Sequence, residues 1–246
     1  MIRLEGITKF YMDKGGIGKG NRVYALKDLN QEFSDGKIYA VFGNSGCGKT
    51  TLANVISGYS TPDSGHVYYD GSLVKRENSV RIVFQDPYTS LNGSKDVAWH
   101  METTARINGM NPEKIWNIYE NLGFFRSNYE NRMVWTLSGG ELQILSFTIA
   151  FAQKPRCIVL DEPFSYLDTM TINRVMNLMR NTKDKILYIY MDNDMNRCGY
   201  ISDDILIMDG GSIIEQGQTD TVIMHPEKEF TKGIIRNIPD IRKRIE

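Results

Sequence analysis

Uninterrupted apolar runs of three to five residues recur along the chain, and they predict strands that are buried on both faces. The clearest is Ile38–Phe42, which reads Ile-Tyr-Ala-Val-Phe and is followed at once by a glycine-rich loop. Similar runs lie at residues 82–84, 157–160 and 186–190. Such runs are typical of the central strands of a parallel sheet, whose two faces are covered. The pattern therefore predicts an α/β core.

A second part of the chain is predicted to be β-rich and antiparallel. Residues 3–8 and 23–33 read as strands, and a glycine-rich loop at 15–20 separates them. Residues 66–74 read as a hairpin around the Asp70-Gly71 turn. Because all these elements except the hairpin precede the first buried strand, we expect an N-terminal antiparallel β subdomain.

The period of the pattern becomes helical between about residues 94 and 150. Asn111 and Pro112 are predicted to be the cap and the first-turn proline of one helix in this stretch. We therefore expect a helical subdomain inserted into the α/β core. A closing hairpin at 203–215 and C-terminal helices at about 218–246 are expected to complete the chain.

Composition favours one domain with an ordinary core, since the chain has 246 residues of which 41% are hydrophobic. A net charge of -1 gives no general attraction to nucleic acid, and the basic run at 242–244 is expected to be solvated. No apolar run approaches the ~20 residues that cross a bilayer, and the first residues lack a signal-peptide pattern, so we expect a cytosolic chain. The cysteines form no C-x-x-C pair and are expected to be reduced thiols: Cys47, Cys157 and Cys198.

The loop after the first buried strand fits G-x-x-x-x-G-K-[ST] and precedes a predicted helix. Glycines let successive backbone N–H groups surround phosphates, Lys49 reaches the β- and γ-phosphates, and the Thr50 hydroxyl can ligate Mg²⁺. The strand before it and the helix after it disfavour an ordinary glycine-rich turn. Cys47 reads as a tolerated small residue, although bulky alkylation there should block ATP binding. The predicted ATP-binding residues are Gly43, Asn44, Ser45, Gly46, Cys47, Gly48, Lys49, Thr50 and Thr51.

A second phosphate-binding surface is predicted at residues 137–143, which read Leu-Ser-Gly-Gly-Glu-Leu-Gln and are called the signature below. Ser138 can cap the helix that follows, while Gly139 and Gly140 leave backbone N–H groups bare at its positive end. The signature lies between the phosphate-binding loop and the acidic pair Asp161-Glu162. This order of motifs resembles only the ABC-type ATPases.

The resemblance covers nearly the whole chain and implies a fold as well as an activity. It implies a P-loop NTPase with a RecA-like core, an N-terminal antiparallel β subdomain and an inserted helical subdomain, together forming one ABC ATP-binding domain over residues 1–246. It also implies ATP and Mg²⁺ as ligands. In this family the signature binds ATP held by a second ATPase subunit, so the resemblance implies a dimer.

The same resemblance assigns catalytic and metal-binding roles. Asp161 would hold Mg²⁺ through water, and Glu162 would polarise the attacking water as general base. A hydrophobic strand that ends in two acids is a weak signal alone, and its place after the signature strengthens it. Gln85 matches the glutamine that senses Mg²⁺ and water in this family, and Asp168 falls at the family's dimer seam. In isolation these two would be read as a surface residue and a helix cap.

Aromatic residues have less specific assignments. Tyr11 is the candidate to stack on adenine, Phe10 is its competitor, and a core role for either stays open. The tryptophans of the helical part could form a groove for a membrane subunit or pack in the core, and they are Trp99, Trp116 and Trp135.

Two stretches narrow the resemblance to the ATPases of oligopeptide, dipeptide and nickel importers. They are residues 84–92, which read Phe-Gln-Asp-Pro-Tyr-Thr-Ser-Leu-Asn, and the region from His225-Pro226 to residue 239. This class implies a second ATPase subunit, different or identical, two transmembrane permease subunits and, indirectly, an extracellular substrate-binding lipoprotein. It places the chain at the cytoplasmic face of the membrane, without nucleic acid. Small peptides, nickel and a metal-chelator complex are all compatible cargoes.

The chain departs from the family pattern at two places. The resemblance requires a switch histidine at the end of the strand at 186–190, and we expect Met191 at that position, where a thioether cannot donate a hydrogen bond. Two arginines of the family are replaced by Ile144 and Ile149. These losses favour an asymmetric heterodimer in which this chain's own site is slow. The alternative is that Glu162 and bound water suffice.

Three classes of function follow. The first is the energy-coupling ATPase of an importer, and the second is a degenerate ATP-binding regulatory subunit whose signature serves the catalytic site of its partner. The third, an ABC ATPase acting on DNA or ribosomes, is disfavoured because the chain has one cassette and no heptad run.

Overall fold

Two sheets organise the protein in a computed structural model, which describes residues 1–13, 21–73 and 80–238. The smaller sheet has four strands in the order β2-β1-β4-β5, and its pairs are antiparallel. This confirms the prediction of an antiparallel N-terminal part. The bounds of its strands are β1 (Ile2–Met12), β2 (Arg22–Phe33), β4 (Ser64–Tyr69) and β5 (Ser72–Leu73).

The larger sheet has six strands in the order β10-β9-β3-β8-β7-β6. All of its pairs are parallel except that of β9 with β10. Every residue of β3, β7 and β8 is buried, as the continuous apolar runs predicted. The bounds are β3 (Ile38–Phe42), β6 (Val80–Val83), β7 (Cys157–Asp161), β8 (Leu187–Asp192), β9 (Asp204–Asp209) and β10 (Ser212–Gln218).

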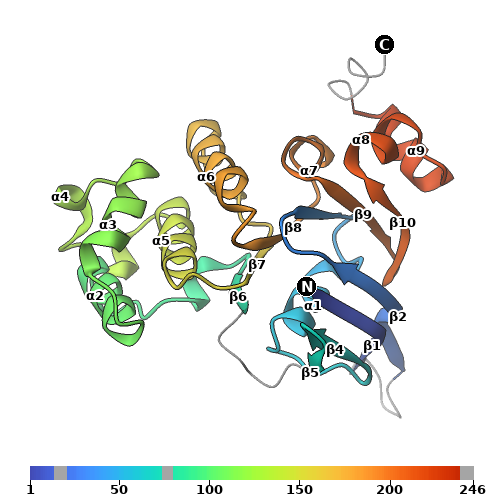
Figure 1. The fold of residues 1–246 in the computed structure, drawn as a ribbon, viewed down its shortest axis with the longest axis horizontal. Helices are drawn as coiled ribbons and strands as arrows, with labels where there is room; N and C mark the ends of the chain where they lie inside the picture. Colours follow the sequence, from blue (N-terminus) through green and yellow to red (C-terminus); the bar gives the residue numbers. More distant parts are fainter. Residues whose placement is uncertain (14–20, 74–79, 239–246) are drawn as a thin grey trace.

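Helices lie on both sides of the larger sheet, and α2 to α5 gather into a group on one side of the molecule (Figure 1). In α3 the Asn111 side chain accepts a hydrogen bond from the Glu113 N–H and Pro112 occupies the first turn, as predicted. The helices are α1 (Lys49–Ile56), α2 (Val97–Ile107), α3 (Pro112–Asn121), α4 (Arg126–Tyr129), α5 (Gly139–Ala152), α6 (Thr169–Thr182), α7 (Met195–Ile201), α8 (Thr219–Met224) and α9 (Glu229–Arg236). Short 3-10 turns span Pro87–Thr89 and Val134–Thr136.

Two buried clusters cover the two faces of the larger sheet. Ile38, Ala40 and Phe42 of β3 belong to the cluster that includes residues of α2, α3, α5 and α6. Tyr39 and Val41 belong to the other, which β3 shares with α1 and the smaller sheet. The alternation along β3 thus places apolar side chains on both faces, and this holds the strand that leads into the phosphate-binding loop rigidly in place.

The predictions for the tryptophans, the cysteines and the loops have different outcomes in the structure. Trp116 is buried in the core, whereas Trp99 and Trp135 are exposed. The cysteines are buried free thiols. The glycine-rich loop at 15–20, Val74 of the predicted hairpin and the basic run at 242–244 lie outside the described residues. No helix in the described ranges combines the length and apolar character that a membrane span needs.

Candidate functional site

The carboxyl ends of three neighbouring parallel strands bring the predicted site residues to one edge of the larger sheet. Phe42 at the end of β3 pairs with Asp192 of β8, and Asp161 at the end of β7 pairs with Met191 of β8. The residues that follow these strands therefore lie side by side. Ligands of open α/β sheets bind at this edge.

The phosphate-binding loop needs glycine at two positions because other groups approach it closely. A Cβ atom on Gly43 would lie 2.4 Å from the Cys47 Sγ. One on Gly48, where φ is +112°, would lie 2.4 Å from the Ala25 carbonyl oxygen. The loop is also fixed by the Gly211 N–H, which donates to the Cys47 carbonyl over 3.0 Å. The loop conformation is thus set by backbone contacts with β2 and the turn after β9.

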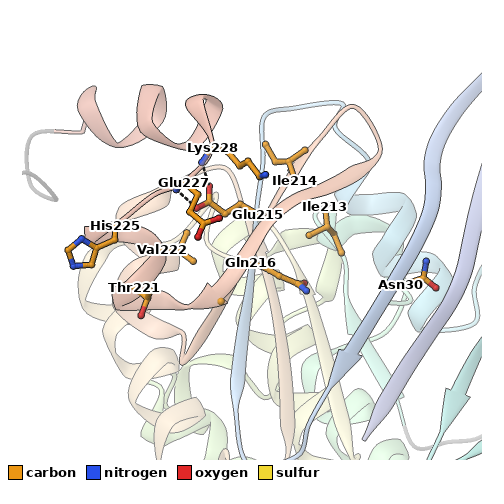
Figure 2. Close-up of a pocket in the computed structure, with 11 residues that line it drawn as sticks. Asn30, Ile213, Ile214, Glu215, Gln216, Thr221, Val222, His225, Glu227 and Lys228 are labelled. Carbon is orange, nitrogen blue, oxygen red and sulfur yellow. Dashed lines mark hydrogen bonds between the residues drawn. The ribbon is translucent and has the colours of Figure 1, made fainter.

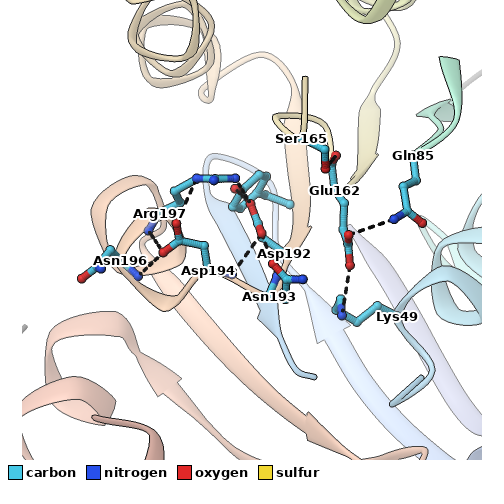
Figure 3. A network of polar contacts seen from close by, with 10 residues as sticks. Lys49, Gln85, Glu162, Ser165, Asp192, Asn193, Asp194, Asn196 and Arg197 are labelled. Atoms are coloured by element: carbon cyan, nitrogen blue, oxygen red, sulfur yellow. Dashed lines mark hydrogen bonds and ion pairs between the residues drawn. The ribbon is translucent and has the colours of Figure 1, made fainter. Parts of the chain in front are cut away.

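Lys49 is only 4% exposed and its ammonium group is held by the loop itself. Its Nζ donates to the carbonyl oxygens of Gly43 at 2.7 Å and Asn44 at 3.3 Å, and it lies 3.4 Å from a Glu162 carboxylate oxygen. The other Glu162 oxygen accepts a hydrogen bond from the Gln85 amide at 3.0 Å. Figure 3 shows Lys49 and Gln85 at the two oxygens of this carboxylate. The structure therefore brings together the three residues that the sequence predicted to be catalytic.

Asp161 has the properties of a cation ligand. It is 1% exposed, and one of its carboxylate oxygens, Oδ1, has no hydrogen-bond partner. Burial raises the pKa of this carboxyl group, while a hydrogen bond from the Thr50 hydroxyl opposes the rise. A buried unpaired oxygen beside a hydroxyl fits Mg²⁺, which takes few protein ligands and keeps waters and phosphates for the rest. Among the described residues, no cluster of three or more His, Cys, Asp or Glu that could hold a metal occurs.

Glu162 has an unusual backbone that is fixed from both sides. Its φ is +44°, in the left-handed region that non-glycine residues rarely adopt. Its N–H donates to the Met191 carbonyl at 2.9 Å, and its carbonyl accepts from the Ser165 hydroxyl at 3.1 Å. Such backbone strain persists where the surroundings determine it, and here it turns the carboxylate toward Lys49.

A cavity of about 260 Å³ lies over this edge. Tyr11 lines it, whereas Phe10 packs against Tyr24 with 5.8 Å between ring centroids. This difference favours Tyr11 over Phe10, and the stacking itself stays a prediction. The lining residues are Tyr11, Ala25, Ser45, Gly46, Gly48, Lys49, Thr50, Thr51, Gln85 and Glu162.

The signature starts α5 as predicted but lines no part of this cavity. The Ser138 hydroxyl accepts from the Glu141 N–H at 3.3 Å, and the Glu141 carboxylate accepts from the Ser138 N–H at 2.7 Å, forming a capping box. The glycines also have a packing role. A Cβ atom on Gly139 would lie 3.0 Å from the Tyr166 ring, and one on Gly140 would lie 2.6 Å from the Tyr166 carbonyl oxygen.

Met191, which the sequence places at the family's switch-histidine position, does not face the cavity, and its correspondence to that histidine stays a prediction. Met191 is completely buried, in the same cluster as Val41 and Leu52, because alternation along β8 turns it into the core. The first exposed residue after β8 is Asn193. One residue type in the sequence indicated that the strand ends before position 194. Asp194 is of a type that often caps helices, and it does cap α7.

Three further predicted positions have structural roles. Ile144 is buried in the core, and Ile149 packs partly buried against it. The Asp168 carboxylate accepts from the Thr171 N–H at 2.9 Å and caps α6. Its place at a dimer seam stays a prediction.

A second cavity, of about 330 Å³, lies between β10 and the C-terminal helices (Figure 2). There the Glu215 carboxylate accepts from the N–H groups of Glu227 at 2.7 Å and Lys228 at 3.2 Å. These contacts hold the His225-Pro226 turn against the sheet. This gives the turn a structural role and places it apart from the Lys49 cavity.

Comparison with known proteins extends these observations. The family model described as ABC transporter matches residues 26–165. The dipeptide transport ATP-binding protein DppF of Haemophilus influenzae is 31% identical over 97% of this chain and 78% of its own length. The putrescine export system ATP-binding protein SapF of Escherichia coli is 29% identical over 96% of this chain and 92% of its own. A dimeric post-hydrolysis structure of the ATP-binding cassette MJ0796, bound to ADP and Pi, is similar with a TM-score of 0.77 and 23% identity, covering 89% of this chain and 99% of that one.

Proposed function

This chain belongs to the ABC transporter family, and we propose that it is the ATP-hydrolysing subunit of a membrane importer for small peptides. The family hydrolyses ATP with Mg²⁺ and couples this to transport through membrane subunits. The peptide cargo is supported by the names of relatives at about 30% identity, such as the dipeptide transport protein. Nickel, a metal chelate and putrescine are the competing cargoes.

The observation that carries the ATPase assignment is the double contact of the Glu162 carboxylate. Lys49 and Gln85 approach its two oxygens, so the predicted base, phosphate ligand and water sensor occupy one cavity wall. A carboxylate placed between an ammonium group and an amide is held in one orientation, which is what a general base requires.

Each residue at this edge has a separate task in the proposed reaction. The Lys49 ammonium group would give up its hydrogen bonds to the loop carbonyl oxygens and donate to phosphate oxygens instead, since it can donate to both kinds of oxygen. Glu162 would then accept a proton from the attacking water, with its orientation kept by the Gln85 amide. Bound Mg²⁺, held by Thr50, Gln85 and Asp161, would supply positive charge that offsets the charge on the phosphates.

We further propose that the chain pairs with a second ATPase subunit, a different one in the native complex, beneath two permease subunits at the cytoplasmic face of the membrane. An extracellular binding protein would deliver the cargo. The geometry supports a pair because the signature lines no part of the cavity that contains Lys49. A phosphate-binding surface that its own site does not use is available to another chain.

The cargo class is tested by purifying the chain with its copurifying membrane subunits and reconstituting them in vesicles with the binding protein. We expect di- and tripeptides to stimulate ATP hydrolysis several-fold, while Ni²⁺, a chelated metal and putrescine leave the basal rate unchanged. Stimulation by one of the latter three, with none by peptides, would refute the peptide assignment and leave the ATPase assignment intact.

A further inference from the structure

The signature contains a carboxylate that the proposed reaction does not use. Glu141 is the fifth residue of the signature, and one of its carboxylate oxygens accepts from the Ser138 N–H at 2.7 Å. The Arg132 guanidinium donates to both carboxylate oxygens, at 2.8 Å and 3.3 Å. The Tyr129 hydroxyl donates to one of them at 3.0 Å. Both oxygens are thus occupied, and the carboxylate is held at the start of α5.

The same guanidinium fixes the segment that leads into the signature. It donates to the Thr136 carbonyl oxygen at 2.9 Å, and it lies 5.3 Å from the centre of the Tyr129 ring. Arg132 therefore contacts the chain on both sides of Ser138. The planar fork of an arginine makes several such contacts at once, whereas a lysine ammonium acts as a point charge.

Glu141 keeps its negative charge at neutral pH. Burial alone would raise the pKa of this carboxyl group, but hydrogen bonds from the Ser138 N–H, Arg132 and Tyr129 hold the pKa below its usual value. A negative charge at the start of a helix stabilises the helix. It also repels any phosphate that approaches the same helix end, since like charges repel.

Arg132 is the residue that balances this charge. Within the described part of the chain, it is the one cation that forms an ion pair with the Glu141 carboxylate. The two side chains are 36% and 19% exposed, and ion pairs at such exposure contribute little net stability. The larger effect of the pair is on the local charge. Without Arg132, an uncompensated carboxylate would lie beside the backbone N–H groups of Gly139 and Gly140.

We propose that Arg132 is a positioning residue for ATP hydrolysis: it cancels the charge of Glu141 and orients the signature, so that the signature accepts the phosphate of ATP held by the partner subunit. This rests on the proposed function, in which the signature completes the partner's ATP site. The balance of charge between positions 132 and 141 then matters more than the guanidinium itself. Removing both charges should therefore restore what removing the positive charge alone has lost.

The test measures the KM for ATP in hydrolysis by the assembled complex. Arg132→Gln should raise KM about tenfold, because the Glu141 charge is then uncompensated. Glu141→Gln alone should not raise KM. The double variant should return to within about twofold of wild type. A double variant whose KM stays as high as that of Arg132→Gln would overturn the charge balance.

The conservative variant and the salt dependence separate charge from folding. Arg132→Lys keeps the charge and loses the fork, so its KM should stay within about threefold of wild type. The rise in KM for Arg132→Gln should shrink between about 0.1 M and about 1 M salt, where the Debye length falls from about 10 Å to about 3 Å. A lysine variant as impaired as Arg132→Gln, or a rise that is independent of salt, would overturn the inference.

Arg126→Gln is the matched control for the loss of one positive charge. Arg126 lies on α4 in the same helical group and forms ion pairs with Glu113 and Glu130 outside the signature. Its replacement should leave KM unchanged, and a rise equal to that of Arg132→Gln would contradict a local effect at the signature. A wild-type complex that hydrolyses no ATP would overturn the proposed function and this inference with it, whereas a failed rescue overturns the inference alone.

Discussion

At the scale of single residues, Gly140 has a reason to be glycine that does not depend on phosphate. A Cβ atom there would lie 2.6 Å from the Tyr166 carbonyl oxygen, which belongs to the main chain and cannot rotate away. The segment before α6, which contains Tyr166, therefore packs closely against the start of α5.

Replacing Gly140 by alanine should therefore destabilise the fold. We expect a loss of about 1–3 kcal/mol in the free energy of unfolding, the usual cost of overpacking, measured by urea denaturation. Gly233→Ala is the matched control, because that glycine lies in α9 with nothing within 4 Å of the added Cβ. It should be more stable than wild type by about 0.5–1 kcal/mol. Similar effects of the two variants would refute the packing account.

At the scale of elements, the start of α5 depends on the charge of Glu141. Burial alone would raise the pKa of this carboxyl group, but hydrogen bonds from the Ser138 N–H, Arg132 and Tyr129 hold it below its usual value of 4.5. A carboxyl group whose pKa is lowered by folding stabilises the fold above its unfolded pKa. That stabilisation is lost as the pH falls through the lower, folded pKa.

Glu141→Gln should consequently cost about 1 kcal/mol at pH 7, the usual contribution of a capping interaction. The difference from wild type should shrink as the pH falls from about 4.5, where the carboxylate of the unfolded chain becomes protonated, through the lower pKa of the folded state. Thermal unfolding from pH 7 to pH 3 measures both effects. Glu102→Gln, at an exposed position of α2, is the control. A difference that stays constant over this range would contradict the charge-dependent cap.

The elements that the sequence predicted well are those with a local signal. The apolar runs that became β3, β7 and β8 needed only their own composition, and Asn111-Pro112 marked the start of α3 by itself. The place of Asn193 next to the phosphate-binding loop was missed because it depends on neighbouring strands from distant parts of the chain. Whether β8 ended before or after Met191 could not be read from a continuous apolar run. The contact of Tyr166 with the signature glycines was also missed, because it joins two parts of the chain that are distant in sequence.

At the scale of the whole molecule, the cavity that contains Lys49 and the signature lie in different parts of the chain, and in the proposed pair they belong to two different ATP sites. Lys49 and Glu162 line the cavity at the sheet edge, and Ser138 starts a helix outside it. Figure 1 shows α5 within the helical group, apart from α1 at the phosphate-binding loop. This arrangement supports the proposal that a second subunit completes each ATP site.

Ser138→Asp distinguishes an effect on the chain's own ATP site from an effect on the proposed partner's site. Aspartate caps a helix as well as serine does, but it brings a negative charge toward the partner's phosphate. The ATP affinity of the isolated chain should stay within about twofold of wild type, since this residue is outside its own cavity. ATP hydrolysis by the assembled complex should fall at least about tenfold. Ser127→Asp, on α4, controls for the added charge. A large loss of the chain's own ATP affinity would contradict the two-site arrangement.

The most direct test of the account is ATP hydrolysis by the assembled complex when the partner ATPase has lost its own general base. We predict that hydrolysis continues at this chain's site. Adding Glu162→Gln should then reduce it at least about 100-fold, the usual contribution of a general base, with ATP still bound. If no hydrolysis remains once the partner's base is removed, the site at Glu162 is degenerate and the chain is a regulatory subunit instead.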